Sequence, residues 1–113
     1  MSSSLKDKVV LITGAASGIG KATARRFAKE GSKLVLNDID EAALVELKKS
    51  LFNPTIHELV IGDISKEAIV ETFIHKAVIR FGKVDVLVNN AGIHFIKDIE
   101  EATVADFDRV FDV

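Results

Sequence analysis

The stretch TGAASGIG, residues 13–20, lies between a β-branched run and a segment of helical period, and its glycines have the spacing G-x-x-x-G-x-G. Gly14 can leave a strand with positive φ, Gly18 has no Cβ to keep an anion from the backbone, and Gly20 allows close helix packing. The N–H groups and dipole of the helix start favour an anion. The stretch therefore predicts a phosphate-binding turn, and the alternative is a glycine-rich turn that binds nothing.

Short β-branched runs alternate with segments of helical period along the chain on both sides of this turn. The expected strands are Val9–Thr13, Lys33–Asn37, Leu59–Ile61 and Val84–Val88. Nearly continuous apolar strands are typical of a parallel sheet whose two faces are covered by helices. Right-handed crossovers then predict an α/β fold with an open, doubly wound parallel sheet in the strand order 3-2-1-4.

Amphipathic helices are expected between these strands. In the first helix the side chains expected to face the core recur at four-residue spacing, namely Ile19, Thr23 and Phe27, beside Ala24 and Ala28. Asp40 is the expected N-cap of the second helix and Ser65 that of the third, which Gly82 should end.

A fourth helix is expected from Thr103, where Asp106 would complete a capping box. The stretch FDRVFDV, residues 107–113, would form its second turn, and it carries no glycine, proline or cationic last turn. We therefore expect the fold to be truncated after this helix begins.

Acidic side chains are expected at the carboxyl ends of the second and third strands. Asp38 stands 24 residues after Gly14, where a carboxylate can accept hydrogen bonds from both hydroxyls of an adenosine ribose. A 2′-phosphate would meet like charge there, which favours NAD over NADP. Aspartate is also an ordinary turn residue at such a position. Asp63 could accept from an adenine amino group or act as a local cap.

The stretch NNAG, residues 89–92, follows the fourth strand. In the order 3-2-1-4, the ends of strands one and four flank the switch point where ligands of open α/β sheets bind. We expect the amides of Asn89 and Asn90 to bridge neighbouring backbone groups there, and Gly92 to permit a close approach of the backbone.

TGAASGIG, Asp38, Asp63 and NNAG, in this order and spacing, resemble the short-chain dehydrogenase/reductases of the NAD(P)-dependent Rossmann type, from Lys6 onward. The resemblance implies a full domain of about twice this length that transfers hydride between nicotinamide and a carbonyl or secondary alcohol. Residues 1–113 would be its N-terminal cofactor-binding half, with the catalytic half absent. NAD would be the cofactor, a small molecule the substrate, and the full-length protein a homo-oligomer.

The resemblance also assigns cofactor-binding residues. They are Gly14, Ser17, Gly18, Ile19 and Gly20 at the pyrophosphate, Asp38 at the adenosine ribose, Asp63 and Ile64 at the adenine, and Asn90, Ala91 and Gly92 at the nicotinamide side.

Catalytic residues are not expected in this chain. The family uses a serine, a Tyr-x-x-x-Lys pair and an asparagine, but the sequence contains no tyrosine, and its serines all have turn, cap or terminal interpretations. We therefore expect the chain to be inactive alone. Two alternatives stay open: a short non-enzymatic protein that binds NAD or is completed by a partner, and an S-adenosylmethionine-binding Rossmann protein, whose pattern does not include NNAG.

Composition argues against several other classes of protein. The formal net charge is −2, with no basic field for nucleic acid. The absence of cysteine excludes disulfides and thiolate chemistry. Neither a signal sequence nor an apolar stretch of roughly 18 residues is present, so we expect a cytoplasmic protein without a membrane span. The three histidines are too scattered for a metal site, and His57 and His75 are expected on the surface. His94 and Phe95 could line a substrate pocket in the full-length protein or form a plain loop.

Overall fold

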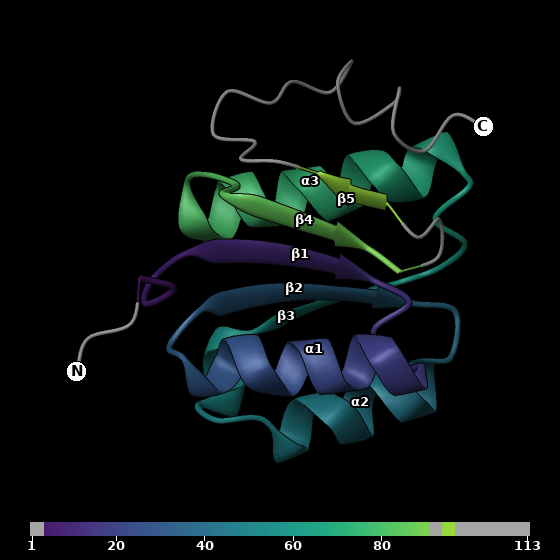
Figure 1. Ribbon diagram of the computed structural model, residues 1–113. Coiled ribbons are helices and arrows are strands. Elements are labelled where there is room, and N and C mark those ends of the chain that lie inside the picture. Colours follow the sequence, from purple (N-terminus) through teal and green to yellow (C-terminus); the bar gives the residue numbers. More distant parts are fainter. Residues whose placement is uncertain (1–3, 91–93, 97–113) are drawn as a thin grey trace.

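Figure 1 shows a computed structural model of the chain, in which residues 4–90 and 94–96 are described. The elements are, in chain order, β1 (Val9–Thr13), α1 (Gly18–Lys29), β2 (Lys33–Asp38), α2 (Glu41–Ser50), the 3₁₀ helix η1 (Pro54–Ile56), β3 (Glu58–Ile61), α3 (Glu67–Phe81), β4 (Val86–Asn89) and β5 (His94–Ile96). Within these described ranges, no helix is long and apolar enough to cross a membrane. The helix expected from Thr103, with FDRVFDV, lies outside the described residues.

The strands form one sheet in the order β3-β2-β1-β4-β5. β1 pairs in parallel with β2 and β4, and β2 in parallel with β3, so the predicted order 3-2-1-4 is confirmed. β5 was not predicted: the loop expected at His94 and Phe95 is instead a short strand antiparallel to β4, with Asn89 opposite His94. Antiparallel neighbours need only a short connection, which an alternation of strands and helices does not signal.

The sheet separates two layers of core, and α1 and α2 cover one face while α3 covers the other (Figure 1). Successive side chains of a strand point to opposite faces. Val9 and Leu11 therefore pack in the layer under α3, and Val10 and Ile12 in the layer under α1 and α2. All five residues of β1 are buried, as expected for the central strand of a sheet covered on both faces.

The buried stripe of α1 consists of Gly20, Ala24 and Ala28, at four-residue spacing. The expectation that Ile19 faces the core is wrong, since 75% of this residue is exposed. These small residues let the helix pack close to the sheet. The face of α1 that contacts the sheet therefore lies one residue after the positions of the larger apolar residues from which it was predicted. Phe27 is partly buried at the edge of this layer.

Two of the three helix ends predicted from the sequence are confirmed. Asp40 is the N-cap of α2 and accepts a bond of 3.0 Å from the N–H of Ala43. Gly82 ends α3 with φ 80°. The prediction that Ser65 caps α3 is wrong, because Lys66 is the N-cap residue. Ser65 is held in the preceding turn, where its N–H and hydroxyl both donate to Oδ1 of Asp63.

His57 lies in the core between η1 and β3, and the prediction that it lies on the surface is wrong, since it is 0% exposed. Its Nδ1 accepts from the N–H of Leu34 at 3.1 Å, and its Nε2 lies 3.0 Å from the carbonyl oxygen of Phe52. These partners assign the neutral tautomer with the proton on Nε2. His75, on α3, is exposed as expected.

Candidate functional site

The carboxyl ends of β1 to β4 meet at one edge of the sheet, where α1 also begins (Figure 1). Parallel strands bring the segments that follow them to this edge, which is where ligands of open α/β sheets bind. Four of the sequence features meet here: the glycine-rich turn after β1, Asp38 at the end of β2, Asp63 after β3, and Asn89 with Asn90 at the end of β4.

The glycine-rich turn leaves β1 at Gly14 with φ 60°, which confirms the predicted positive φ. The N–H and hydroxyl of Ser17 both donate to the carbonyl oxygen of Gly14, at 3.2 and 2.7 Å. Ser17 is the N-cap residue of α1, yet its side chain makes no capping bond to the helix. The N–H groups of the first helical residues, Gly18, Ile19 and Gly20, have no acceptor four residues earlier within the helix, so they can donate to an anion.

The two later glycines of the turn have different surroundings. A Cβ on Gly20 would overlap the carbonyl oxygen of Gly14 and lie 2.9 Å from Cα of Ala15. The close packing predicted for Gly20 is therefore present, and its nearest contact is the turn itself. A Cβ on Gly18 would meet nothing within 4 Å. Gly18 thus opens outward, which leaves the backbone at the start of α1 accessible to a ligand.

Asp38 is the last residue of β2 and is partly buried. Its Oδ2 accepts from the N–H of Ala16 at 3.0 Å, and its Oδ1 from the N–H of Asp40 at 3.1 Å. The carboxylate therefore links the glycine-rich turn to the end of β2. The neighbouring Ile39 is 73% exposed, and sequence reasoning missed it, although an isoleucine directly after a strand-end acid was a usable signal.

Asp63 lies at the same edge and is exposed. The N–H and hydroxyl of Ser65 both donate to its Oδ1, at 2.9 and 2.8 Å, and these bonds hold the pKa of Asp63 below its ordinary value. This is the local capping role that the sequence left open. Ile64 packs against the layer under α3, so it presents less surface at this edge than Ile39 does.

Both amides at the end of β4 contact β1, and that of Asn90 bonds to a backbone group as predicted, whereas that of Asn89 accepts from a side-chain hydroxyl. The side chain of Asn90 donates to the carbonyl oxygen of Thr13 at 3.1 Å, and the hydroxyl of Thr13 donates to Oδ1 of Asn89 at 2.8 Å. Thr13 was not singled out from the sequence. These bonds hold the ends of β1 and β4 together at the switch point. Ala91 and Gly92 lie outside the described residues.

Asn37 fixes the end of β3 from the other side of the site. Its buried amide donates to the carbonyl oxygens of Val60 and Gly62, at 3.0 and 3.1 Å. Sequence reasoning missed this role, for which a polar residue inside an apolar strand was the signal. The pair Asn37 and Asp38 thus connects β2 to β3 and to the glycine-rich turn.

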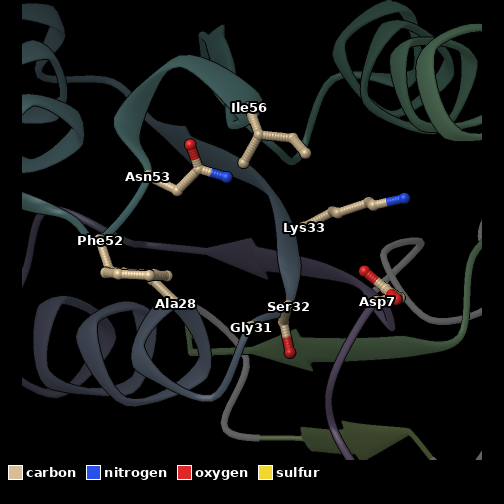
Figure 2. A pocket seen from close by; sticks show the side chains of 8 residues that line it. All are labelled: Asp7, Ala28, Gly31, Ser32, Lys33, Phe52, Asn53 and Ile56. Carbon is tan, nitrogen blue, oxygen red and sulfur yellow. The ribbon is translucent and has the colours of Figure 1, made fainter.

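No group of three or more metal-ligating side chains occurs in the ranges 4–90 and 94–96. Figure 2 shows a separate small recess at the amino end of β2, lined by Asp7, Ala28, Gly31, Ser32, Lys33, Phe52, Asn53 and Ile56. Because β2 runs from Lys33 to Asp38, this recess lies at the opposite end of the strand from the glycine-rich turn. It does not contribute to the edge described above.

Comparison with known proteins gives consistent results. The family model described as short chain dehydrogenase matches residues 8–113. An uncharacterized oxidoreductase of Thermotoga maritima is 47% identical over 109 residues, which is 94% of this chain and 42% of the relative. A mitochondrial borneol dehydrogenase of Lavandula x intermedia is 42% identical over 111 residues, which is 96% of this chain and 41% of the relative. The chain thus spans about two-fifths of the length of these relatives.

A solved structure also matches nearly the whole of this chain and less than half of its own length. The 3-ketoacyl-(acyl-carrier-protein) reductase from Brucella melitensis, complexed with NADH, superposes with a TM-score of 0.72 at 45% identity. The match covers 95% of this chain and 44% of that one. The similarity therefore extends over nearly the whole of the chain's fold, including the edge where the glycine-rich turn lies.

Proposed function

The chain belongs to the short-chain dehydrogenase family, and on this premise we propose that it is the N-terminal, cofactor-binding half of a Rossmann domain. The whole protein would transfer hydride between a nicotinamide dinucleotide and the carbonyl or secondary alcohol of a small molecule, and it would assemble as a homo-oligomer.

The observation that carries the cofactor assignment is the uncapped start of α1. The hydroxyl of Ser17 is turned to Gly14 and not to the helix, and Gly18 leaves the backbone open. These features suit a pyrophosphate, because helix N–H groups and the helix dipole favour an anion at this place. We assign Gly14, Ser17, Gly18, Ile19 and Gly20 to the pyrophosphate.

Asp38 fits the adenosine ribose. An ionised carboxylate has about four lone-pair sites, and two backbone N–H groups occupy two of them. Two sites are left for two ribose hydroxyls. A 2′-phosphate would instead meet the negative charge of Asp38, so we propose a preference for NAD over NADP.

The remaining contacts of the cofactor are assigned to neighbouring strand ends. Asp63 and Ile64 would contact the adenine, and the exposed Ile39 offers a further apolar surface next to Asp38. Asn90, Ala91 and Gly92 would lie at the nicotinamide side, where Asn90 is held against β1 by its bond to Thr13.

When bound, the nicotinamide supplies the hydride donor or acceptor. The residues of this chain would bind and orient the cofactor, but the chain contains no tyrosine to serve as the family's general acid or base. We propose that the catalytic groups lie in the part of the relatives that this chain does not span, and that the 113-residue chain has no activity alone. Reduction of NAD by this chain with any alcohol would disprove that statement.

Binding of NADH and NADPH tests the proposal directly. The fluorescence of the reduced nicotinamide reports binding of either cofactor. We expect NADH to bind at least about tenfold more tightly than NADPH, which corresponds to about 1.4 kcal/mol. Asp38→Asn should narrow that ratio, whereas Asp40→Asn, which removes a charge two residues away, should leave it nearly unchanged.

Other outcomes would point to other functions. Binding of S-adenosylmethionine without binding of NADH would favour the methyl-donor alternative and overturn the dehydrogenase proposal. Equal changes in NADH and NADPH affinity for Asp38→Asn would remove Asp38 from the ribose site.

A further inference from the structure

The N–H groups of the glycine-rich turn fall into two sets. Those of Ala15, Ala16 and Ser17 are bonded within the protein: Ala15 to the carbonyl oxygen of Asn37 at 2.9 Å, Ala16 to Oδ2 of Asp38 at 3.0 Å, and Ser17 to the carbonyl oxygen of Gly14 at 3.2 Å. The next three, at Gly18, Ile19 and Gly20, begin the helix. The end of β2 therefore restrains the first half of the turn, whereas the amides of the second half have no acceptor four residues earlier within the helix.

Of the two bonds from β2 to the turn, only the one from Asp38 depends on a side chain. The bond to the Asn37 carbonyl oxygen is a main-chain contact that most substitutions would keep. The bond from Ala16 to Oδ2 is charge-assisted, and bonds of that kind are roughly twice as strong as neutral ones. The residue type at position 38 therefore determines whether the N–H of Ala16 keeps a side-chain acceptor.

We propose that Asp38 is a positioning residue for the glycine-rich turn, in addition to any contact that it makes with a ribose. Its Oδ2 anchors the N–H of Ala16, and this bond holds the turn in the conformation that presents the first amides of α1. The effect on the pyrophosphate rests on the proposed function, whereas the anchoring of Ala16 does not.

The proposal has a specific consequence for changes of cofactor preference. Replacing Asp38 by a residue with no acceptor removes the charge that repels a 2′-phosphate, and it also releases the turn. Asp38→Ala should therefore weaken ligands that make no contact with the carboxylate. Asp38→Asn keeps an oxygen that can accept from Ala16, so it separates loss of charge from loss of the anchor.

Amide hydrogen exchange of the folded protein tests the anchor without any ligand. In Asp38→Ala we expect the Ala16 amide to exchange roughly tenfold faster or more, as for loss of a hydrogen bond to a charged group. The Ala15 amide, bonded to the Asn37 carbonyl, is the internal reference and should accelerate less. Asp38→Asn and the control Asp40→Asn should stay within about threefold of the wild type, well under that loss. Unchanged exchange at Ala16 in Asp38→Ala, or equal acceleration at Ala15, would overturn the proposal.

A ligand without the ribose contact tests the effect on the site. NADH whose adenosine ribose lacks both the 2′- and 3′-hydroxyl groups cannot bond to Asp38 through them. We expect Asp38→Ala to bind this analogue several-fold more weakly than the wild type, on the order of one hydrogen bond, and Asp38→Asn to restore most of the affinity. Equal affinity of the wild type and Asp38→Ala for this analogue would mean that Asp38 acts only through the ribose hydroxyls, and it would overturn the proposal. Failure of the wild type to bind NADH itself would overturn the proposed function and leave the exchange result to decide the anchor.

Discussion

The N–H of Leu34 donates to Nδ1 of His57 at 3.1 Å, one residue before the pairing of β2 with β3 begins at Val35 and Glu58. The imidazole takes the place of a strand carbonyl at this point and extends the hydrogen bonding of β2. Burial lowers the pKa of His57; the bond to the Phe52 carbonyl oxygen opposes this shift, and the nearby Lys48 adds to it. The ring is thus held neutral in the folded protein.

This arrangement makes the free energy of unfolding depend on pH. An unfolded histidine takes up a proton near pH 6.5, whereas folded His57 does so only at lower pH. Stability should therefore be complete above about pH 6.5 and should fall as the pH drops from there toward the lowered pKa of the folded state. Urea unfolding between roughly pH 8 and 5 measures this. His57→Asn should flatten this dependence, and His75→Gln, on the exposed face of α3, should leave it unchanged. An unchanged slope in His57→Asn would contradict the assignment.

Substitution by alanine should lower the free energy of unfolding at Gly20 but weaken only cofactor binding at Gly18. Gly20→Ala places a methyl group on the Gly14 carbonyl, and it should lower the free energy of unfolding by about 1–3 kcal/mol, as for an overpacked core. Gly18→Ala meets no atom of the protein, so it should unfold like the wild type but bind NADH more weakly. Urea unfolding and NADH titration of both variants check this pair. Equal stability of Gly20→Ala and wild type would show that the turn can move away.

Asp85 should stabilise the start of β4. It is 3% exposed, accepts from the N–H of Val9 at 2.8 Å and lies 3.0 Å from Nζ of Lys83. Burial raises its pKa, but these two partners and the nearby charge of Lys8 together outweigh burial and hold the pKa below its ordinary value. Asp85→Ala should cost about 1–3 kcal/mol of stability at neutral pH, because the Val9 N–H loses its partner.

The stability that Asp85 contributes should be present above its unfolded pKa, near 3.9, and disappear as the pH falls through the lower pKa of the folded state. Lys83→Ala is the matched control: its side chain is 49% exposed, so it should cost less than about 1 kcal/mol. Equal losses for Asp85→Ala and Lys83→Ala would mean that the ion pair, and not the bond to Val9, is what matters.

The hydroxyl of Thr13 should matter more than its methyl group. Thr13→Val keeps the shape but removes the bond of 2.8 Å to Asn89, and it should lower the free energy of unfolding by about 1 kcal/mol. Thr13→Ser keeps the hydroxyl and should recover most of that loss. Thermal unfolding of the two variants compares them, and a Thr13→Ser variant less stable than Thr13→Val would reverse this ranking.

The features that the sequence predicted correctly depend on local patterns. The four parallel strands follow from β-branched runs, the positive φ at Gly14 and Gly82 from glycine, and the cap at Asp40 from the helix turn that follows it. The wrong predictions concern positions that tertiary packing decides. Ile19 is exposed because small residues form the contact of α1, and His57 is buried because a strand N–H 23 residues away needs an acceptor.

For the candidate site, too, the sequence predicted the positions of residues better than the hydrogen bonds between them. The site's described residues lie at the edge of the sheet that the sequence predicted, because parallel strands bring their carboxyl ends together. The bonds that organise it were mostly not predicted, since they join residues distant in sequence: Ala16 with Asp38, 22 residues apart, and Thr13 with Asn89, 76 apart. Bridging to backbone groups was expected for the amides of both Asn89 and Asn90, and the bond from Asn90 to the carbonyl oxygen of Thr13 is of that kind.

The complete burial of β1 has a consequence for how this protein can vary. The side chains of Val9 and Leu11 belong to one core layer and those of Val10 and Ile12 to the other, while the buried Thr13 is bonded to Asn89. The strand therefore has no exposed position. Exchanges at residues 9–12 should be limited to apolar residues of nearly equal volume, and at Thr13 to residues that keep the hydroxyl. The glycine-rich turn is therefore attached to a strand that tolerates few substitutions. In a library of random variants, fewer folded and active variants should carry a substitution in residues 9–13 than on an exposed helix face.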